Sequence, residues 1–344
     1  MSFGLILLII LLVLLAGLAG RIVYEVTHPE IRRYAVRTDK LTSSEKVRIA
    51  FLADLHSRQY GKGNIKLIQM VSRAKPDFII LGGDMLTASH FLNRDEIAIS
   101  TLEGLGNIAP VFYVPGNHEK KLMESEDEKL SERWDDYLFE LECMDLNWLA
   151  DDRDIMTEDM NVYGLDIDRR FYTKFGKSSM MPVNYIQEKL GLPDRRKFNI
   201  LVAHSPEFFD TYAKTGYDLV LCGHYHGGMV NLPWLGPVIA PNFTFRPEHS
   251  GGAYKKDGRV IIVTRGIGSH GVNIRLFNRP EVVLIDVKQT QSSSRRNKAG
   301  KGSEQKNTAG TAWKDDESSA AGSDDAALNG GGSTAADKGY PSER

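Results

Sequence analysis

The chain has 344 residues, of which 42% are hydrophobic and 26% are charged, and its formal net charge is −2. This is ordinary globular composition, and the near-neutral balance gives no general reason to expect binding to a nucleic-acid polymer. Only two cysteines occur, Cys143 and Cys222, so neither a disulfide framework nor a cysteine-based zinc site is expected.

The N-terminal stretch is strongly apolar. Residues 1–20 carry no charged side chain, and 3–19 are almost wholly Leu, Ile, Val, Ala and Gly. Because about 20 such residues span a bilayer core as a helix, we predict a transmembrane anchor at 1–23 and a location in the cell membrane. A cleaved signal peptide is the alternative, but no basic residue precedes the apolar run. The basic residues after the run favour a cytoplasmic domain, although many N-terminal anchors export the domain attached to them.

Residues 24–45 are polar and mixed, and we expect a connector there, followed by one domain at 46–288. Runs rich in β-branched and aromatic residues predict strands at 47–52, 77–81, 111–114, 162–166, 199–203, 217–222, 259–264 and 281–286. Helical periodicity predicts helices at 64–75 and 95–105. This alternation favours an α/β fold.

Three other segments have distinct compositions. Residues 120–149 are highly charged and carry apolar residues at helical spacing, which predicts a surface helix. Residues 169–197 are expected to form an irregular, basic connection. Residues 289–344 are rich in Ser, Gly, Ala, Lys and Asp, and they bury too little apolar surface to offset their ordering entropy, so we predict a disordered tail.

Residues of metal-ligand type come directly after five of the predicted strands. They are Asp54 with His56, Asp84, Asn117 with His118, His204, and His224 with His226. One such histidine is ordinarily a core residue bonded to a backbone carbonyl, but that explanation would have to hold independently at several strand ends. Carboxylates and imidazoles without thiolates suit Mn²⁺, Fe, Zn²⁺ or Mg²⁺. Two such ions about 3.5–4 Å apart can hold a bridging hydroxide and clamp a phosphate.

Two other phosphate and acyl-transfer signatures are missing from the sequence. There is no Gly-rich loop followed by Lys and Ser or Thr, and there is no Gly-x-Ser-x-Gly elbow.

The motifs after the strands resemble, in order, those of the calcineurin-like metallophosphoesterases over residues 47–287. These motifs are Asp54-x-His56, Gly83-Asp84, Gly116-Asn117-His118-Glu119, His204 and Gly223-His224-x-His226. Residues 223–236 and 265–281 are similar to the branch of transmembrane proteins with a metallophosphoesterase domain. The resemblance implies a four-layer αββα sandwich of two mixed sheets flanked by helices.

The resemblance also implies the site chemistry. A first divalent metal would be held by Asp54, His56, Asp84 and His226, and a second by Asp84, Asn117, His204 and His224. A metal-bridging hydroxide would attack phosphorus, and His118 would protonate the leaving oxygen, a task for which histidine is suited near neutral pH. The substrate-binding residues are not identified.

The expected activity is hydrolysis of a phosphodiester, pyrophosphate or phosphomonoester bond. The branch resemblance suggests a lipid-linked or nucleotide substrate, such as a UDP-diacylglucosamine-like lipid precursor. The Asp-Arg-Gly of the Ser/Thr protein phosphatases is absent, because Gly83-Asp84 continues as Met85-Leu86-Thr87. Protein phosphatase activity is therefore not expected.

Several alternatives stay open at the level of sequence. The domain could be a non-catalytic, metal-containing module that binds a phosphorylated lipid or partner at the membrane, although its complete set of ligand residues favours an enzyme. Glu119 could orient His118 or be solvated. The apolar stretch 232–241 could meet a membrane or an acyl chain, and Arg246, Arg265 and Arg275 could bind a substrate phosphate. The oligomeric state is not predicted.

Overall fold

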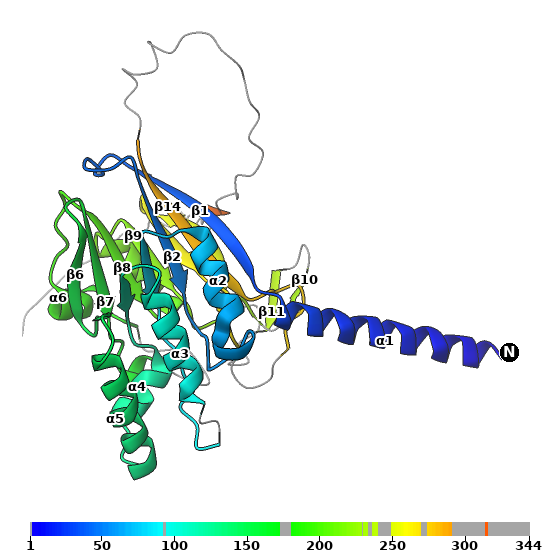
Figure 1. Ribbon diagram of the computed structural model, residues 1–344. Helices are drawn as coiled ribbons and strands as arrows, with labels where there is room; N and C mark the ends of the chain where they lie inside the picture. Colours follow the sequence, from blue (N-terminus) through cyan, green and yellow to red (C-terminus); the bar gives the residue numbers. More distant parts are fainter. Residues whose placement is uncertain are drawn as a thin grey trace, which may run out of the picture.

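The computed structural model describes residues 2–91, 94–172, 180–228, 230–232, 236–239, 249–269, 274–290 and 314–315. A body built on two large sheets lies at one end of a long N-terminal helix, α1, which projects away from it (Figure 1). The predicted disordered tail and the stretches 233–235 and 240–248 lie outside the described residues, apart from residues 289–290 and 314–315.

The first sheet has six strands in the order β1-β14-β2-β3-β4-β5. Their bounds are β1 Glu30–Thr38, β14 Glu281–Gln289, β2 Lys46–Leu52, β3 Phe78–Leu81, β4 Val111–Tyr113 and β5 Asn147–Trp148. Strands β2, β3 and β4 run parallel to one another, whereas β14 is antiparallel to β2. The carboxyl ends of β2, β3 and β4 therefore meet at one edge.

The second sheet has seven strands in the order β15-β12-β13-β9-β8-β7-β6. Their bounds are β15 Lys314–Asp315, β12 Gly252–Lys256, β13 Arg259–Val263, β9 Leu219–Cys222, β8 Phe198–Ala203, β7 Met160–Leu165 and β6 Asp152–Thr157. Strands β7, β8, β9 and β13 are parallel, so their carboxyl ends also share an edge. A separate pair, β10 Val230–Leu232 and β11 Gly236–Ile239, is antiparallel.

Alternating side chains divide the core into three apolar layers. On β2, Ile49 and Phe51 pack between the two sheets, and Ala50 and Leu52 pack under helices. This is the period-two pattern of a strand that is buried on both faces. The helices outside the first sheet are α2 Ile65–Ala74, α3 Asp95–Gly106, α4 Asn117–Met123 and α5 Glu128–Glu142, and those outside the second are α6 Val183–Leu190 and α7 Phe209–Lys214. The predicted four-layer αββα sandwich is confirmed.

Strand β1 differs from the expected connector at 24–45. It pairs in parallel with β14 from Glu30 opposite Glu281 to Thr38 opposite Gln289. Its buried side chains, Tyr34 and Val36 among them, alternate with exposed ones such as Arg33 and Arg37. An edge strand with one charged face has no continuous apolar run, which is why composition suggested a connector.

The helix predicted in the charged segment 120–149 is present, whereas the segment 169–197 contains a helix that the sequence pattern did not predict. The charged segment 120–149 holds the end of α4 and all of α5, and the α5 residues Trp134, Tyr137 and Leu141 are buried against the first sheet. The segment 169–197, expected to be irregular, contains α6, which covers the second sheet with Tyr185 and Ile186.

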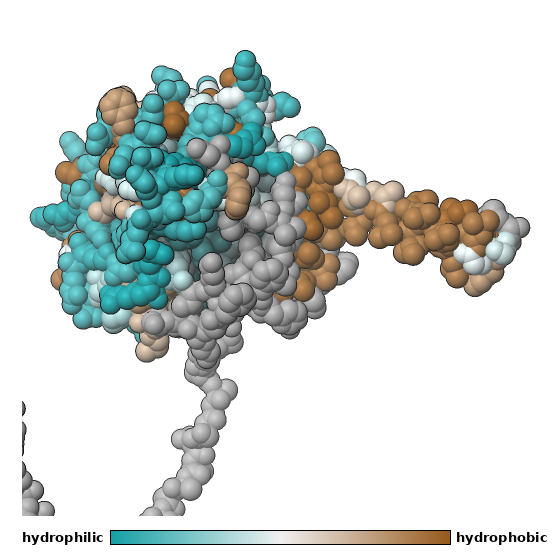
Figure 2. All heavy atoms as spheres, turned by 90° about the horizontal axis from the view of Figure 1, so that it is seen from below, coloured by the Kyte–Doolittle hydropathy of each residue, from teal (hydrophilic) through white to brown (hydrophobic). Residues whose placement is uncertain are grey.

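Helix α1 (Phe3–Thr27) has the length and composition to cross a membrane. Its most apolar window has a mean hydropathy of 3.0, and none of that window is buried. Figure 2 shows the helix as an apolar rod leaving a largely polar body. The helix extends past residue 23 and ends before His28-Pro29, since the residue before a proline disfavours helical backbone. Its last turn touches the body, where Glu25 and Val26 are buried.

Candidate metal centre

The strand ends of both sheets converge on one site. On the first sheet, the backbone N–H of Asp54 donates to the carbonyl of Gly83 (2.9 Å), and that of His56 donates to the carbonyl of Asp84 (3.0 Å). The loops after β2 and β3 are therefore held side by side. The second sheet joins through His224, whose backbone N–H lies 3.0 Å and 3.1 Å from the two carboxylate oxygens of Asp54.

The predicted site residues come together in three overlapping groups. These are Asp54 with His56 and His226, His56 with Asp84 and His118, and Asp84 with His204 and His224. Within each group the potential ligand atoms lie within 4.8 Å of one another. Asn117 begins α4 directly before His118, and its Oδ1 is buried. Seven of the eight predicted residues thus lie around one centre, and Asn117 is the immediate neighbour of one of them in the chain.

Asp84 lies at the middle of these groups. Its Oδ2 is 3.2 Å from Nε2 of His204, 3.7 Å from Nε2 of His56 and 4.0 Å from Nε2 of His118. Its Oδ1 accepts the backbone N–H of His118 at 2.8 Å. Burial alone would raise the pKa of this carboxyl, but the imidazoles, with His204 foremost, outweigh burial and lower the pKa well below its usual range.

The neighbouring carboxyl of Asp54 behaves oppositely. Burial, reinforced by the charge of Asp84, raises its pKa to about 7, although His204 and the N–H of His224 oppose this shift. For His204, burial lowers the pKa, but Asp84 and then Asp54 outweigh it and raise the pKa to about 10. Both carboxyls lie within 3.7 Å of Nε2 of His204, and this concentration of buried negative charge favours a bound proton or a metal ion.

The ring of each of two histidines is oriented by a backbone carbonyl. His204 donates from Nδ1 to the carbonyl of Gly82 (2.6 Å), and His226 donates from Nδ1 to that of Gly268 (3.3 Å). A carbonyl oxygen only accepts, so Nδ1 carries the proton in both rings. In the neutral ring, Nε2 then presents a lone pair to the site, as metal-binding histidines do.

His118 has the opposite tautomer. The backbone N–H of Ala88 donates to its Nδ1 at 2.9 Å, so Nδ1 accepts and Nε2 carries the proton. That Nε2 faces Asp84 from 4.0 Å. His118 therefore presents a hydrogen-bond donor to the centre, whereas the neutral rings of His204 and His226 present a lone pair on Nε2 that can bind a metal ion.

Much of the backbone at the centre is strained. Five residues there have positive φ: Asp54 (57°), His56 (47°), Asp84 (55°), His224 (71°) and His226 (51°). Positive φ is uncommon for residues other than glycine, and such strain, of order 1–3 kcal/mol each, persists only where the surroundings enforce it. Because of these turns, two side chains from one loop, such as Asp54 and His56, can both point toward the centre.

Glu119 enforces the turn at Asp84. It is fully buried and accepts the backbone N–H groups of Asp84, Met85 and Gly116 at 2.8–2.9 Å, together with the hydroxyl of Tyr113 at 2.8 Å. Glu119 is therefore not solvated, and none of these bonds is to the His118 ring. Its carboxylate ties the loop after β3 to the loop after β4.

Two motif glycines allow the close approach. A Cβ on Gly223 would lie 2.7 Å from Oδ2 of Asp54, and one on Gly116 would overlap the Asp84 carboxylate. Glycine is therefore required where the backbone of one loop packs on the carboxylate of another.

The structure also places the secondary candidates. Arg265 is paired with Glu281 at 3.0 Å, and Arg275 is buried and donates to the carbonyl of Gly268 and the hydroxyl of Ser269. Both support the fold around the centre, while Arg246 lies outside the described residues. Sequence reasoning missed Tyr172, whose ring centroid lies 5.4 Å from that of His224, because its segment carries no periodic signal.

The comparisons with known proteins agree with this geometry. The profile of the calcineurin-like phosphoesterase family matches residues 47–228, more than half of the chain. The chain belongs to this family. As a calcineurin-like phosphoesterase it is a hydrolase whose activity depends on metal.

Curated relatives extend the match beyond that profile. Phosphodiesterase YaeI of Escherichia coli (strain K12) is 27% identical over 70% of this chain and 82% of its own length. The uncharacterized metallophosphoesterase YkoQ of Bacillus subtilis (strain 168) is 24% identical over 72% and 86%. Among solved structures, TT1561 of Thermus thermophilus aligns with a TM-score of 0.40 and 11% identity over 64% of this chain and 90% of that one, so the family assignment rests on sequence.

The donor set fits divalent cations. Nε2 of His204 and Oδ1 of Asn117 are buried and make no hydrogen bond within the described part of the chain, although His204 lies near Asp84. A buried polar atom without a partner is costly. A cation beside Asp84 would satisfy Nε2 of His204, and oxygen and imidazole donors suit Mn²⁺, Fe, Zn²⁺ or Mg²⁺.

Replacing Glu119 tests the role of its buried carboxylate. Glu119→Gln turns one acceptor oxygen into an NH₂ group that faces existing donors, so we expect a loss of about 1–3 kcal/mol in the free energy of unfolding. Urea denaturation of the full chain in detergent measures this loss. The exposed Glu142→Gln is the matched control, and equal stability of the two variants would contradict the assigned role.

Proposed function

We propose that the centre holds two divalent cations that share the carboxylate of Asp84. One cation would take Asp54, His56, Asp84 and His226, and the other Asp84, Asn117, His204 and His224. The observation that carries this proposal is the position of Asp84 Oδ2, which faces imidazole nitrogens from three different strand ends. When bound, such ions act as Lewis acids toward phosphoryl oxygens and lower the pKa of a water molecule.

His118 is proposed to protonate the leaving oxygen. Its Nε2 carries the proton because the N–H of Ala88 occupies Nδ1. Its backbone is fixed by the bond from its N–H to Asp84 Oδ1, so the ring and the carboxylate keep one relative position. The neutral ring that this bond selects donates a hydrogen bond from Nε2 toward the centre. Protonation of the leaving oxygen requires the cationic ring, which carries a second proton on Nδ1 in place of the Ala88 hydrogen bond and becomes neutral again when Nε2 gives up its proton.

The substrate is proposed to be a phosphodiester or pyrophosphate that is linked to a lipid or a nucleotide, at the cell membrane. The support is the position of α1. Glu25 in its last turn accepts a hydrogen bond from the backbone N–H of Asn278, the residue after Phe277. Three apolar side chains near this contact are exposed, namely Leu232 on β10, Ile274 and Phe277. The guanidinium of Arg21 on α1 lies 5.4 Å from the centroid of the Phe277 ring. If α1 crosses a membrane as a single-pass anchor, that bilayer lies near the His226 loop.

Paired variants of the full chain in detergent test the roles of Asp84 and His118. Asp84→Asn removes the shared carboxylate, so we expect loss of bound Mn²⁺ and of bis-p-nitrophenyl phosphate hydrolysis. His118→Asn removes only the proton donor, so we expect turnover to fall about 10²–10⁴-fold with Mn²⁺ retained. Mass spectrometry of bound metal and initial rates measure the two effects. Equal metal loss in both variants would overturn the role given to His118.

A matched pair of substrates tests the lipid proposal. A UDP-linked diacylglucosamine in mixed micelles and UDP-N-acetylglucosamine in solution contain the same type of pyrophosphate. We expect kcat/KM to favour the lipid at least roughly tenfold, because burial of even two CH₂ groups contributes about 1.6 kcal/mol. Equal kcat/KM values would remove the lipid from the proposal while leaving the phosphoesterase activity intact.

A further inference from the structure

The loop that carries His226 has a left-handed backbone over three consecutive residues. His226, Gly227 and Gly228 all have positive φ, at 51°, 69° and 82°. The carbonyls at both ends of this turn, those of His226 and Gly228, accept hydrogen bonds from the same amide, Nδ2 of Asn278, the first at 2.7 Å. One side chain therefore bridges the turn and fixes its backbone.

Asn278 is itself held by helix α1. It is fully buried, and its backbone N–H donates to Oε2 of Glu25 at 2.8 Å. Glu25 is also fully buried, and its Oε1 accepts from Nε of Arg21 at 2.6 Å. A continuous path of hydrogen bonds thus joins the last turn of α1, through Asn278, to the backbone of His226.

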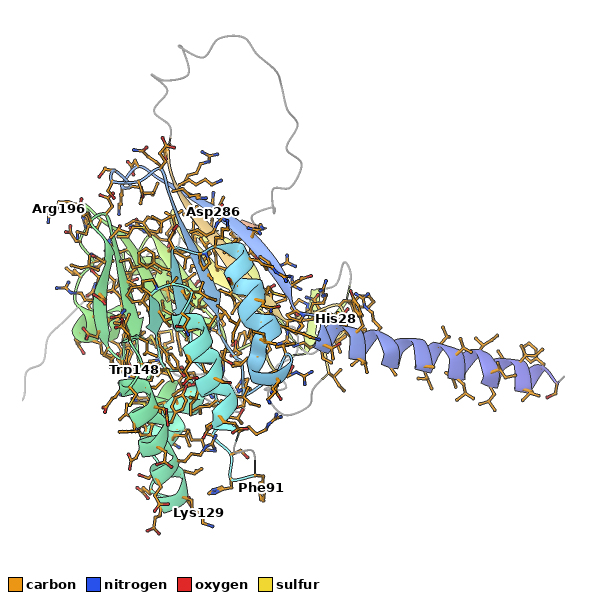
Figure 3. The ribbon with its side chains drawn as sticks, in the orientation of Figure 1. His28, Phe91, Lys129, Trp148, Arg196 and Asp286 are labelled. Atoms are coloured by element: carbon orange, nitrogen blue, oxygen red, sulfur yellow. The ribbon has the colours of Figure 1, made fainter. Side chains whose placement is uncertain are left out.

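The same helix turn also contacts the segment that follows His56. Nη2 of Arg58 donates to the carbonyl of Val26 at 3.1 Å, and Arg58 lies two residues after His56. His56 and His226 face each other with their Nε2 atoms 3.3 Å apart. Figure 3 shows this junction of helix and body at the labelled His28. The end of α1 is therefore connected to both histidine loops of one ligand group.

From these contacts we infer that Asn278 and Glu25 are positioning residues for His226, and that the last turn of α1 is a structural part of the metal centre. This inference rests on the proposed function, because it assigns the two residues to the cation that His226 would hold. It makes α1 more than a membrane segment, since the helix end sets the geometry of a ligand loop.

The chemistry of an amide explains why asparagine suits this position. Carbonyl oxygens only accept hydrogen bonds, so the group between the carbonyls of His226 and Gly228 must supply two N–H donors, and the NH₂ of Asn278 does. An aspartate has the same shape and supplies none. Asn278→Asp therefore removes both hydrogen bonds to the His226 loop while the volume of the side chain stays almost unchanged.

Metal binding by the full chain in detergent tests the inference without relying on turnover. Stripped protein is titrated with Mn²⁺, and bound Mn²⁺ per chain is counted after gel filtration. Wild type is expected to bind two ions. In Asn278→Asp we expect the affinity for one of the two to fall about 10–100-fold, because a residue that orients a ligand controls affinity on this scale, while the other ion binds as before.

Three further variants keep the result interpretable if Asn278→Asp fails to fold by circular dichroism. Glu25→Leu removes the acceptor for the Asn278 N–H and is expected to weaken the same ion, whereas Glu25→Gln keeps one acceptor oxygen and should bind nearly as wild type. Arg279→Ala is the matched control at the same junction, where Arg279 donates to the carbonyls of His28 and Pro29. It should leave both ions unchanged.

The outcomes separate the inference from the proposal beneath it. If folded Asn278→Asp, or Glu25→Leu in its place, binds both ions with wild-type affinity, the positioning role is wrong. If Arg279→Ala weakens binding as much as these variants, the effect belongs to the junction in general, and the inference also fails. If wild type binds no Mn²⁺, the two-cation proposal itself fails.

Discussion

The buried carboxylate of Asp84 is the constraint on which the rest of the structure depends. It faces imidazole nitrogens of His56, His118 and His204, which come from three separate strand ends on two sheets. A carboxyl buried to this degree requires partners for both oxygens, because an unpaired buried charge is costly. The parallel strands, the strained turns and the buried Glu119 all serve to bring those partners to it. The position of the charged groups at the centre is therefore set by several loops together and not by any single loop.

The scaffold supplies this arrangement through its layers. The apolar layer between the sheets holds β2, β3 and β4 opposite β8 and β9, so that strand ends from both sheets open on the same side. Helix-covered outer faces leave the strand ends as the place where polar residues gather, which is general for α/β folds. The positive φ values then turn neighbouring side chains of one loop toward the same point. The buried apolar layers stabilise the fold, and the backbone strain at the centre lies in the loops that follow the strands.

Sequence reasoning was most successful where the signal is local. Apolar runs such as the one before Asp54 and the one before His224 predict strands, and the polar residues after them predict a shared site. It failed at β1, whose alternation of Tyr34 and Val36 with arginines resembles a connector. It also could not assign Glu119, because its partners are backbone N–H groups of distant loops that no pattern encodes. Asn278 has the same property, since its role arises only when a helix residue 253 positions earlier in the chain docks beside it.

The most direct test of the account is anomalous X-ray diffraction from crystals of the full chain grown with Mn²⁺. The account predicts two anomalous peaks that both contact the carboxylate of Asp84, one beside His56 and His226 and the other beside His204 and His224. A single peak, or two peaks of which only one contacts Asp84, would contradict the central claim that this carboxylate is shared between two cations.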